Sequence, residues 1–236
     1  MSKRKLERFA ELGTFQNVIQ PDLEDIFKKD HYIKGRWNEK LFLNTNPIVI
    51  ELGCGKGEYT TGMAEASVDK NYVGIDIKGA RMWKGAKYAH DARLLNAAFL
   101  RIRIDHINSL FAADEVSEIW VTFPDPYENP GRSKKRLTSS VFLSLYQDFL
   151  KNDGLIHLKT DNKILYDYTL NLCLLNKLDI LFNTEDLYQS SLNNNRLQIK
   201  THYESIFLSK GVSIKYLCFR LKKNVMIIES EHTYSK

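Results

Sequence analysis

The stretch PIVIELGCGKGEY, residues 47–59, is a short apolar run followed by glycines at three alternate positions. A run of this length is typical of a buried strand, and the glycines allow the backbone to approach a ligand where the strand ends. The dinucleotide-binding fingerprint would place its third glycine one position later, where Glu58 stands. The stretch therefore predicts the first strand of a nucleoside-binding α/β sheet, and its spacing disfavours a nicotinamide dehydrogenase.

The rest of the chain continues this strand-and-helix alternation. Five such units in succession predict a parallel sheet with helices on both faces. Two closing strands then fit the seven-stranded methyltransferase variant of the Rossmann-like α/β fold. We expect strands over 47–53, 71–77, 98–105, 116–123, 155–160, 179–189 and 213–222, and helices over 58–67, 79–96, 141–150, 161–177 and 201–211.

Residues 1–46 differ from this pattern, since they are polar, interrupted by aromatics, and basic at the start. We expect them to form a partly flexible or helical N-terminal extension, and residues 47–236 to form the methyltransferase domain. The three cysteines show no disulfide or zinc spacing, and no apolar run approaches membrane-spanning length. These features predict a cytoplasmic protein without a membrane partner, either a monomer or a homodimer.

Acidic residues stand at or just after the carboxyl ends of the five predicted parallel strands. In such sheets, ligands bind beyond the carboxyl ends of the strands. Several carboxylates there favour a cationic or hydroxyl-rich ligand over a phosphate, and S-adenosylmethionine fits this pattern. The histidines lack metal-ligand spacing, so we expect no metal. The acids are Glu51, Asp76, Asp105, Asp125 and Asp161.

The segment FPDPYENPGRSKKR, residues 123–136, contains three of the five prolines and four cations within five positions. Prolines on both sides of Asp125 restrict its backbone, which suits a positioning residue. The net charge of +5 is concentrated in this loop and at the N-terminus, which favours a polyanionic partner. The cations predicted to contact an RNA backbone are Arg132, Lys134, Lys135 and Arg136. Solvated charged surfaces, an Asx turn at Asp125 and a helix cap at Asp161 are the simpler alternatives.

Taken in order, the motifs ELGCGKGEY, VGIDIKGAR, LRIRID, FPDPY with KKRL, LKTD and THYE resemble the bacterial tRNA (guanine-N7)-methyltransferases. The resemblance runs from about residue 47 to the C-terminus. It implies methyl transfer from S-adenosylmethionine to N7 of the guanosine at position 46 in the tRNA variable loop. A methyltransferase of the same fold that acts on another RNA, a protein or a small molecule is the alternative. A nucleic-acid-binding protein without catalysis is disfavoured, because it would have no reason to keep the acids.

The same resemblance assigns roles to single residues. It implies that Asp125 is the catalytic residue, and that the methyl donor is bound by Glu51, Gly53, Gly55, Asp76, Asp105 and Asp125. It implies substrate contacts at Asn129, Asp161, Thr201, His202, Tyr203 and Glu204. The chain departs from the family pattern where Tyr127 replaces a tryptophan, Asn129 a lysine, and His106 an alanine.

Overall fold

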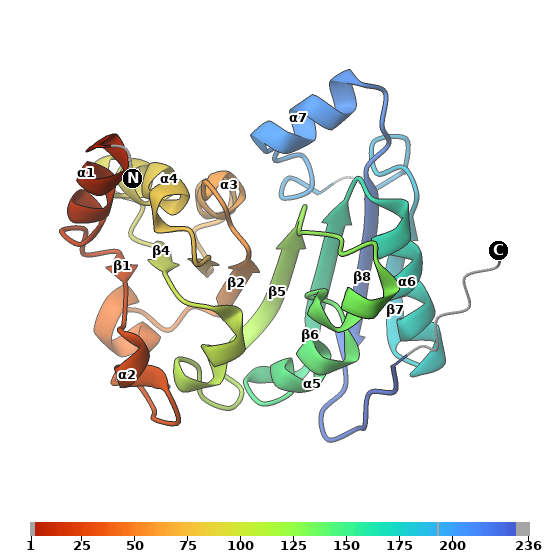
Figure 1. Ribbon diagram of the computed structural model, residues 1–236, viewed down its shortest axis with the longest axis horizontal. Coiled ribbons are helices and arrows are strands. Elements are labelled where there is room, and N and C mark those ends of the chain that lie inside the picture. The colour runs from red at the N-terminus through yellow and green to blue at the C-terminus, as the bar shows by residue number, and fades with distance from the viewer. Residues whose placement is uncertain (1–2, 193, 230–236) are drawn as a thin grey trace.

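The computed structural model describes residues 3–192 and 194–229, which form one mixed sheet with helices around it (Figure 1). The predicted α/β class and all seven predicted strands are confirmed, and the structure adds a short edge strand. The strands are β1 (Val18–Ile19), β2 (Ile48–Leu52), β3 (Asn71–Ile75), β4 (Ala97–Leu100), β5 (Val116–Thr122), β6 (Leu150–Thr160), β7 (Asp179–Thr184) and β8 (Lys215–Leu221). The α-helices are α1 (Lys3–Leu12), α2 (Leu23–Ile26), α3 (Glu58–Ala66), α4 (Gly79–Asp91), α5 (Ser140–Tyr146), α6 (Lys163–Leu175) and α7 (His202–Ser209).

The strand order is β1-β4-β3-β2-β5-β6-β8-β7, and every pair is parallel except those made by β8. The chain builds the sheet outward from β2 in one direction through β3 and β4, and then in the other through β5 and β6. The order therefore reverses between β2 and β5, which is where open α/β sheets bind their ligands.

Alternate residues of the central strand reach two separate apolar cores, as the period of a strand requires. Ile48, Ile50 and Leu52 contribute to the core that also contains side chains of α5 and α6. Val49 contributes to the other core, which contains side chains of α1, α3 and α4. Helices thus cover both faces of the sheet, as predicted, and β2 is buried along its whole length.

Residues 3–46 pack closely on the sheet and its helices. Figure 1 shows α1 beside α4, and β1 pairs with β4 at the edge of the sheet. Trp37 is fully buried, lies 5.0 Å from the Phe111 ring in a stacked arrangement, and donates its indole N–H to the Leu110 carbonyl at 2.8 Å. Both aromatic side chains belong to the core that also contains side chains of α5 and α6.

Some predicted boundaries were wrong. The strand predicted over 98–105 ends at Leu100, because Ile104–Ser109 forms a 3₁₀ helix. Residues 151–154, which the predicted ranges leave as a turn between the helix 141–150 and the strand 155–160, lie inside β6. There the pairing with β5 shifts register, and Asp153 takes a left-handed φ of 57°. An irregularity of this kind has the composition of a turn, so the sequence alone does not distinguish the two.

Within the described residues, no helix is both long enough and apolar enough to cross a membrane.

Candidate active site

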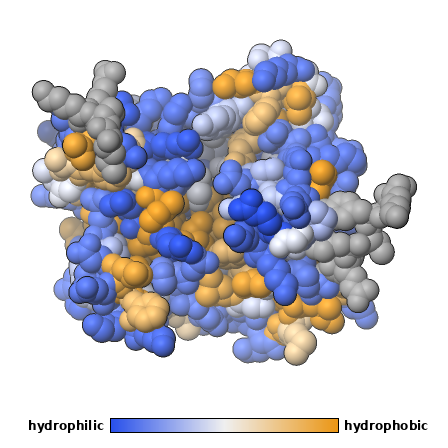
Figure 2. Space-filling view, viewed as in Figure 1, coloured by the Kyte–Doolittle hydropathy of each residue, from blue (hydrophilic) through white to orange (hydrophobic). Residues whose placement is uncertain are grey.

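A pocket of about 660 Å³ lies at the carboxyl ends of β2, β3, β4 and β5, beside the start of α7. Figure 2 shows a hollow near the middle of the molecule in the same orientation as Figure 1, with hydrophilic residues on both sides of it. All the residues predicted to bind the methyl donor line this pocket: Glu51, Gly53, Gly55, Asp76, Asp105 and Asp125. Their predicted contacts with a donor stay predictions, but the sheet does bring them together.

The glycine loop is tied to the end of β3 by one carboxylate. The backbone N–H of Gly55 donates to Asp76 Oδ2 at 2.9 Å, and the N–H of Lys78 donates to Asp76 Oδ1 at 2.7 Å. Gly55 has a φ of 56°, a conformation that favours glycine. Asp76 therefore fixes the loop and also lines the pocket, where each oxygen keeps a second lone pair for a ligand.

The third glycine of the loop is required by a close approach of helices. A Cβ at Gly57 would lie 2.6 Å from a ring carbon of Phe99, and a Cβ at Gly85 would lie 2.8 Å from Gly57 Cα. This contact between the start of α3 and the middle of α4 explains why residue 57 is a glycine.

Glu51 is a buried carboxylate at the end of β2. It accepts hydrogen bonds from the hydroxyls of Thr60 and of Thr122, the latter at 2.5 Å. Burial raises the pKa of Glu51 to about 7. A cationic ligand in the pocket would favour the ionised carboxylate, so this group is suited to respond to ligand charge near neutral pH.

Asp105 is exposed, unlike Glu51 and Asp76, and it already has a partner. Its Oδ2 pairs with Nη2 of Arg103 at 2.9 Å, and both residues line the pocket. A ligand that uses Asp105 would share it with this guanidinium.

Asp125 lies in the middle of an irregular segment, residues 123–127, which we call the acidic corner. The residues Phe123 and Tyr127 have left-handed φ values of 48° and 44°, which are unusual for residues with side chains. The Asp125 side chain is exposed and forms no hydrogen bond or ion pair with the described residues. The corner thus presents a carboxylate that is available to a ligand.

Arg136, predicted to contact an RNA backbone, is buried in this structure, and that contact stays a prediction. The side chain is fully buried, and its guanidinium donates from Nε to the Pro126 carbonyl and from Nη2 to the Tyr127 carbonyl, each at 3.0 Å. It also lies 4.3 Å from the ring centre of Tyr168. Arg136 therefore holds the acidic corner in place.

The local helix explains why one cation of the cluster is buried and the others are not. Pro130–Lys135 is a 3₁₀ helix, in which side chains three residues apart share a face. Ser133 and Arg136 share the buried face, whereas Arg132, Lys134 and Lys135 are exposed. The predicted substrate residue Asn129 caps this helix by accepting from the Gly131 N–H at 2.9 Å, and it does not line the pocket.

Glu204, predicted to contact the substrate, has a structural role in this structure, and the substrate contact stays a prediction. Glu204 is fully buried, and its Oε1 lies 2.8 Å from Lys159 Nζ and accepts from the Tyr188 hydroxyl at 2.6 Å. It also forms a capping box with Thr201 at the start of α7, which is the local reason for the T-x-x-E spacing. Both oxygens have partners inside the protein, so the residue fastens α7.

The remaining predicted substrate residues are divided between the pocket and its surroundings. Thr201 and Tyr203 line the pocket. His202 has an exposed side chain outside it, and its backbone N–H donates to Glu58 Oε2 at 2.8 Å. Asp161 lies outside the lining, and burial raises the pKa of its carboxyl.

Comparison with known proteins places this arrangement in a family. A family model described as a putative methyltransferase matches residues 45–217. Proteins named tRNA (guanine-N(7)-)-methyltransferase are 45% identical in Bacteroides thetaiotaomicron, over 98% of this chain and 91% of that protein, and 47% identical in Christiangramia forsetii, over 94% and 99%. The chain belongs to the tRNA (guanine-N(7)-)-methyltransferase family. Another relative, from Porphyromonas gingivalis, is 49% identical over 89% of this chain and 86% of its own length.

Solved structures agree with the fold of this methyltransferase. The crystal structure of the 16S rRNA methyltransferase KamB aligns with a TM-score of 0.59 at 13% identity, over 78% of this chain and 92% of that one. A structure described as an antibiotic related methyltransferase aligns with a TM-score of 0.60 at 16% identity, over 83% and 97%. At these identities the likeness supports the sheet architecture alone.

Several groups that shape this methyltransferase site were missed in the sequence. Thr60 and Thr122 bind Glu51, and Lys159 holds the carbonyls of Leu197 and Ile199 at 3.0 Å each. Nothing in their local sequence marks these residues, since their partners are distant in the chain. Among the described residues, no cluster of three or more histidine, cysteine, aspartate or glutamate side chains could hold a metal ion.

Arg136→Ala is expected to lower the free energy of unfolding by about 3 kcal/mol, because it removes two charged hydrogen bonds to buried carbonyls. The melting temperature should fall by about 6–12 °C. Arg132→Ala, an exposed neighbour on the same short helix, is the control and should change it by about 1 °C or less. Equal melting temperatures for the two variants would contradict the buried role of Arg136.

Glu204→Gln is expected to lower the free energy of unfolding, measured by urea denaturation, by about 3–5 kcal/mol. The reason is that Lys159 would remain buried without its counter-charge. Combining Lys159→Met with Glu204→Leu removes both charges and should recover part of this loss. A Glu204→Gln protein of unchanged stability that fails to bind RNA would contradict this structural role and support the predicted substrate contact of Glu204.

Proposed function

We propose that this methyltransferase transfers the methyl group of S-adenosylmethionine to N7 of the guanosine at position 46 in the tRNA variable loop. The observation that carries the proposal is the convergence of four carboxylates, Glu51, Asp76, Asp105 and Asp125, on one pocket with Lys134 and Lys135 among its lining residues. The names of relatives that are 45–49% identical over most of the chain support the same substrate.

The groups that line the pocket fit a cationic donor. Glu51 and Asp76 supply carboxylates beside the glycine loop, and Asp76 is placed to accept from ribose hydroxyls. At the start of α3, where nucleotide-binding folds bind phosphate, Glu58 supplies a carboxylate that would repel one. S-adenosylmethionine, when bound, supplies an electrophilic methyl group on a positively charged sulfur and brings no phosphate.

The reaction requires positioning more than proton transfer. Guanine N7 carries a lone pair and no proton, so no general base is needed. The attacking nitrogen must be aligned with the methyl carbon and its sulfur at near-attack distance. In this proposal Asp125, exposed and fixed by the corner beneath it, accepts hydrogen bonds from the substrates and follows the positive charge as it moves to the purine.

The exposed cations beside the acidic corner bind the RNA that carries the base. Arg132, Lys134 and Lys135 form no ion pair with the described carboxylates, so their charges are available to phosphates. Such contacts position a nucleic acid without reading its sequence. Thr201 and Tyr203 approach the pocket from α7 and are the substrate residues best placed to contact the base.

The direct test supplies the purified protein with an unmodified tRNA transcript and methyl-labelled S-adenosylmethionine. The labelled nucleoside is expected to be 7-methylguanosine, and a transcript with adenosine at position 46 should remain unlabelled. Asp125→Asn should reduce the rate about 100-fold or more, since it removes a preorganised charge from the reacting groups.

The control is Asp22→Asn, an exposed acid outside the pocket that makes no side-chain cap bond. Its rate should match the native protein. Label in another nucleoside would overturn the guanine N7 assignment, and label that persists in the adenosine-46 transcript would overturn the position. Donor binding without methylation of any tRNA would favour the alternative substrate classes.

The pKa of Glu51 predicts a pH dependence for donor binding. With a pKa of about 7, the carboxyl is mostly protonated at pH 6 and mostly ionised at pH 8. Affinity for the cationic donor should therefore rise about tenfold over this interval in the native protein. The donor affinity of Glu51→Gln, measured by isothermal titration calorimetry, should not show this part of the rise. Identical pH profiles of affinity for the two proteins would contradict the role of Glu51.

A further inference from the structure

A second group of cations lies on the other side of β2 from the Arg132–Lys135 loop. It comprises Lys5 and Arg8 of α1 together with Lys78, Arg81 and Arg101, and we call it the α1–α4 cationic surface. Lys78 and Arg81 follow β3 and line the pocket, whereas Lys134 and Lys135 follow β5 and line it as well. Because β3 and β5 flank β2 on opposite sides, the pocket has cations on both sides.

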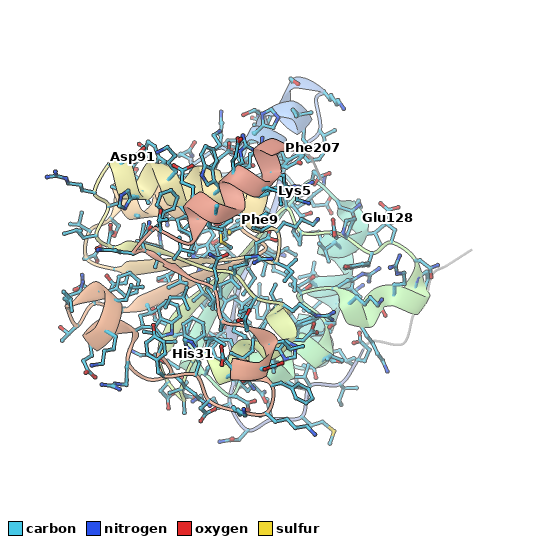
Figure 3. All side chains as sticks on the ribbon, turned by 60° about the vertical axis from the view of Figure 1, so that its left-hand side comes forward. Lys5, Phe9, His31, Asp91, Glu128 and Phe207 are labelled. Carbon is cyan, nitrogen blue, oxygen red and sulfur yellow. The ribbon has the colours of Figure 1, made fainter. Side chains whose placement is uncertain are left out.

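The packing of α1 on α4 extends this surface toward the pocket. A Cβ at Gly79, the first residue of α4, would lie 2.9 Å from a ring carbon of Phe9, and the Trp83 indole N–H donates to Glu11 Oε2 at 2.8 Å. The two helices therefore run in the same direction. Figure 3 shows Lys5 and Phe9 on α1 far from Asp91 at the other end of α4. The turn that contains Lys5 thus projects past the start of α4, on the pocket side.

Aromatic rings hold these cations in place. The guanidinium of Arg8 lies 4.6 Å from the ring centre of Trp83, and that of Arg101 lies 4.8 Å from the ring centre of Phe9. Lys5 Nζ lies 6.0 Å from the same Phe9 ring. Stacking uses the flat face of a guanidinium and leaves its N–H edge for hydrogen bonds, so these groups are preorganised to bind an anion.

The charges of the surface are not neutralised within the protein. Lys5, Arg8, Lys78 and Arg81 form no ion pair with the described carboxylates. Lys87, farther along α4, behaves differently because it pairs with Glu11 and Asp91 at 3.3 and 3.2 Å. Lys84, also on α4, pairs with Glu58 at 3.0 Å. The cations of this helix that stay unpaired among the described residues, Arg81 and the N-cap residue Lys78, are thus the two that line the pocket.

We propose that the α1–α4 cationic surface binds the phosphate backbone of the RNA on the side of the target base opposite the Arg132–Lys135 loop. This inference rests on the proposed function, because it takes the nucleic acid at the pocket as given. The two surfaces together would hold the backbone on both sides of the base that enters the pocket. Contacts of this kind set orientation and carry no sequence preference.

The test compares two charge-reversal variants with the same change in net charge. Lys5→Glu with Arg8→Glu alters the surface, at residues outside the pocket lining. Lys151→Glu with Lys177→Glu is the matched control, since both lysines are exposed and lie near the amino ends of β6 and β7. Binding of a fluorescently labelled, unmodified tRNA transcript is measured by anisotropy at several salt concentrations, and donor affinity by calorimetry.

The surface variant should bind tRNA about tenfold or more weakly, with the slope of log K against log salt reduced by about 1.5, as for two lost phosphate contacts. Its donor affinity should match the native protein, and the control should bind tRNA within about twofold of native. Equal losses in both variants, or no loss in either, would overturn the proposal. An unchanged salt slope in a weaker binder would do so as well.

A single variant separates loss of the surface from loss of folding, and the methylation assay separates this inference from the proposed function. Lys5→Glu alone leaves the stack of Arg8 on Trp83 in place, so it tests the surface even where the double variant unfolds, and it should lose about half of the slope change. The binding assay does not depend on methylation. A native protein that binds tRNA through this surface but forms no 7-methylguanosine would therefore refute the proposed function and keep this inference.

Discussion

The parallel pairing of β2 with both β3 and β5 is the constraint on which the site depends. In this register Leu52 lies opposite Ile75 on one side and Val121 on the other. The residues that follow these three, Gly53, Asp76 and Thr122, therefore lie at one level along the edge of the sheet. Glu51, one position earlier, is held at this edge by the Thr122 hydroxyl. A shift of one residue in either pairing would send these side chains to the opposite face of the sheet and dissolve the pocket.

Beyond the sheet, two buried cations give order to irregular segments. Arg136 donates to the carbonyls of Pro126 and Tyr127, and Lys159 donates to the carbonyls of Leu197 and Ile199. Buried carbonyls without a strand or helix partner need a donor, and a long cationic side chain can reach two at once. Each cation also has a second stabilising neighbour, the Tyr168 ring for Arg136 and Glu204 for Lys159. The acidic corner and the approach to α7 are thereby fixed without regular secondary structure.

The sequence was sufficient for the features that depend on local patterns. Apolar runs ending in glycine or acid identified the strands and brought the donor-binding candidates to one edge, because parallel strands share a direction. It was insufficient where a side chain's role depends on distant partners. Arg136 looks like its neighbours in a basic run, and only the 3₁₀ turn and Tyr168 bury it. Glu204 matched a family motif, but the same spacing is a capping box, and Lys159 and Tyr188 complete its burial. The irregular part of β6 was missed because bulges and turns share a composition.

The distribution of charge separates the two substrates of the proposed reaction. Among the residues that line the pocket, Glu51 and Asp76 are buried or half-buried, whereas cations such as Lys78 and Lys134 are exposed. A cationic donor and an anionic RNA are thus drawn to different parts of one site. Transfer of the methyl group makes the sulfur neutral and the purine positive. The attraction between the inner carboxylates and the spent donor then falls, while Asp125 faces a base of increased charge. Since Glu51 ionises near pH 7, it can take up a proton when the donor's charge is lost, which lowers the cost of an unpaired carboxylate in a buried position. The same acids that hold the donor before transfer would thus hold its product less tightly afterwards.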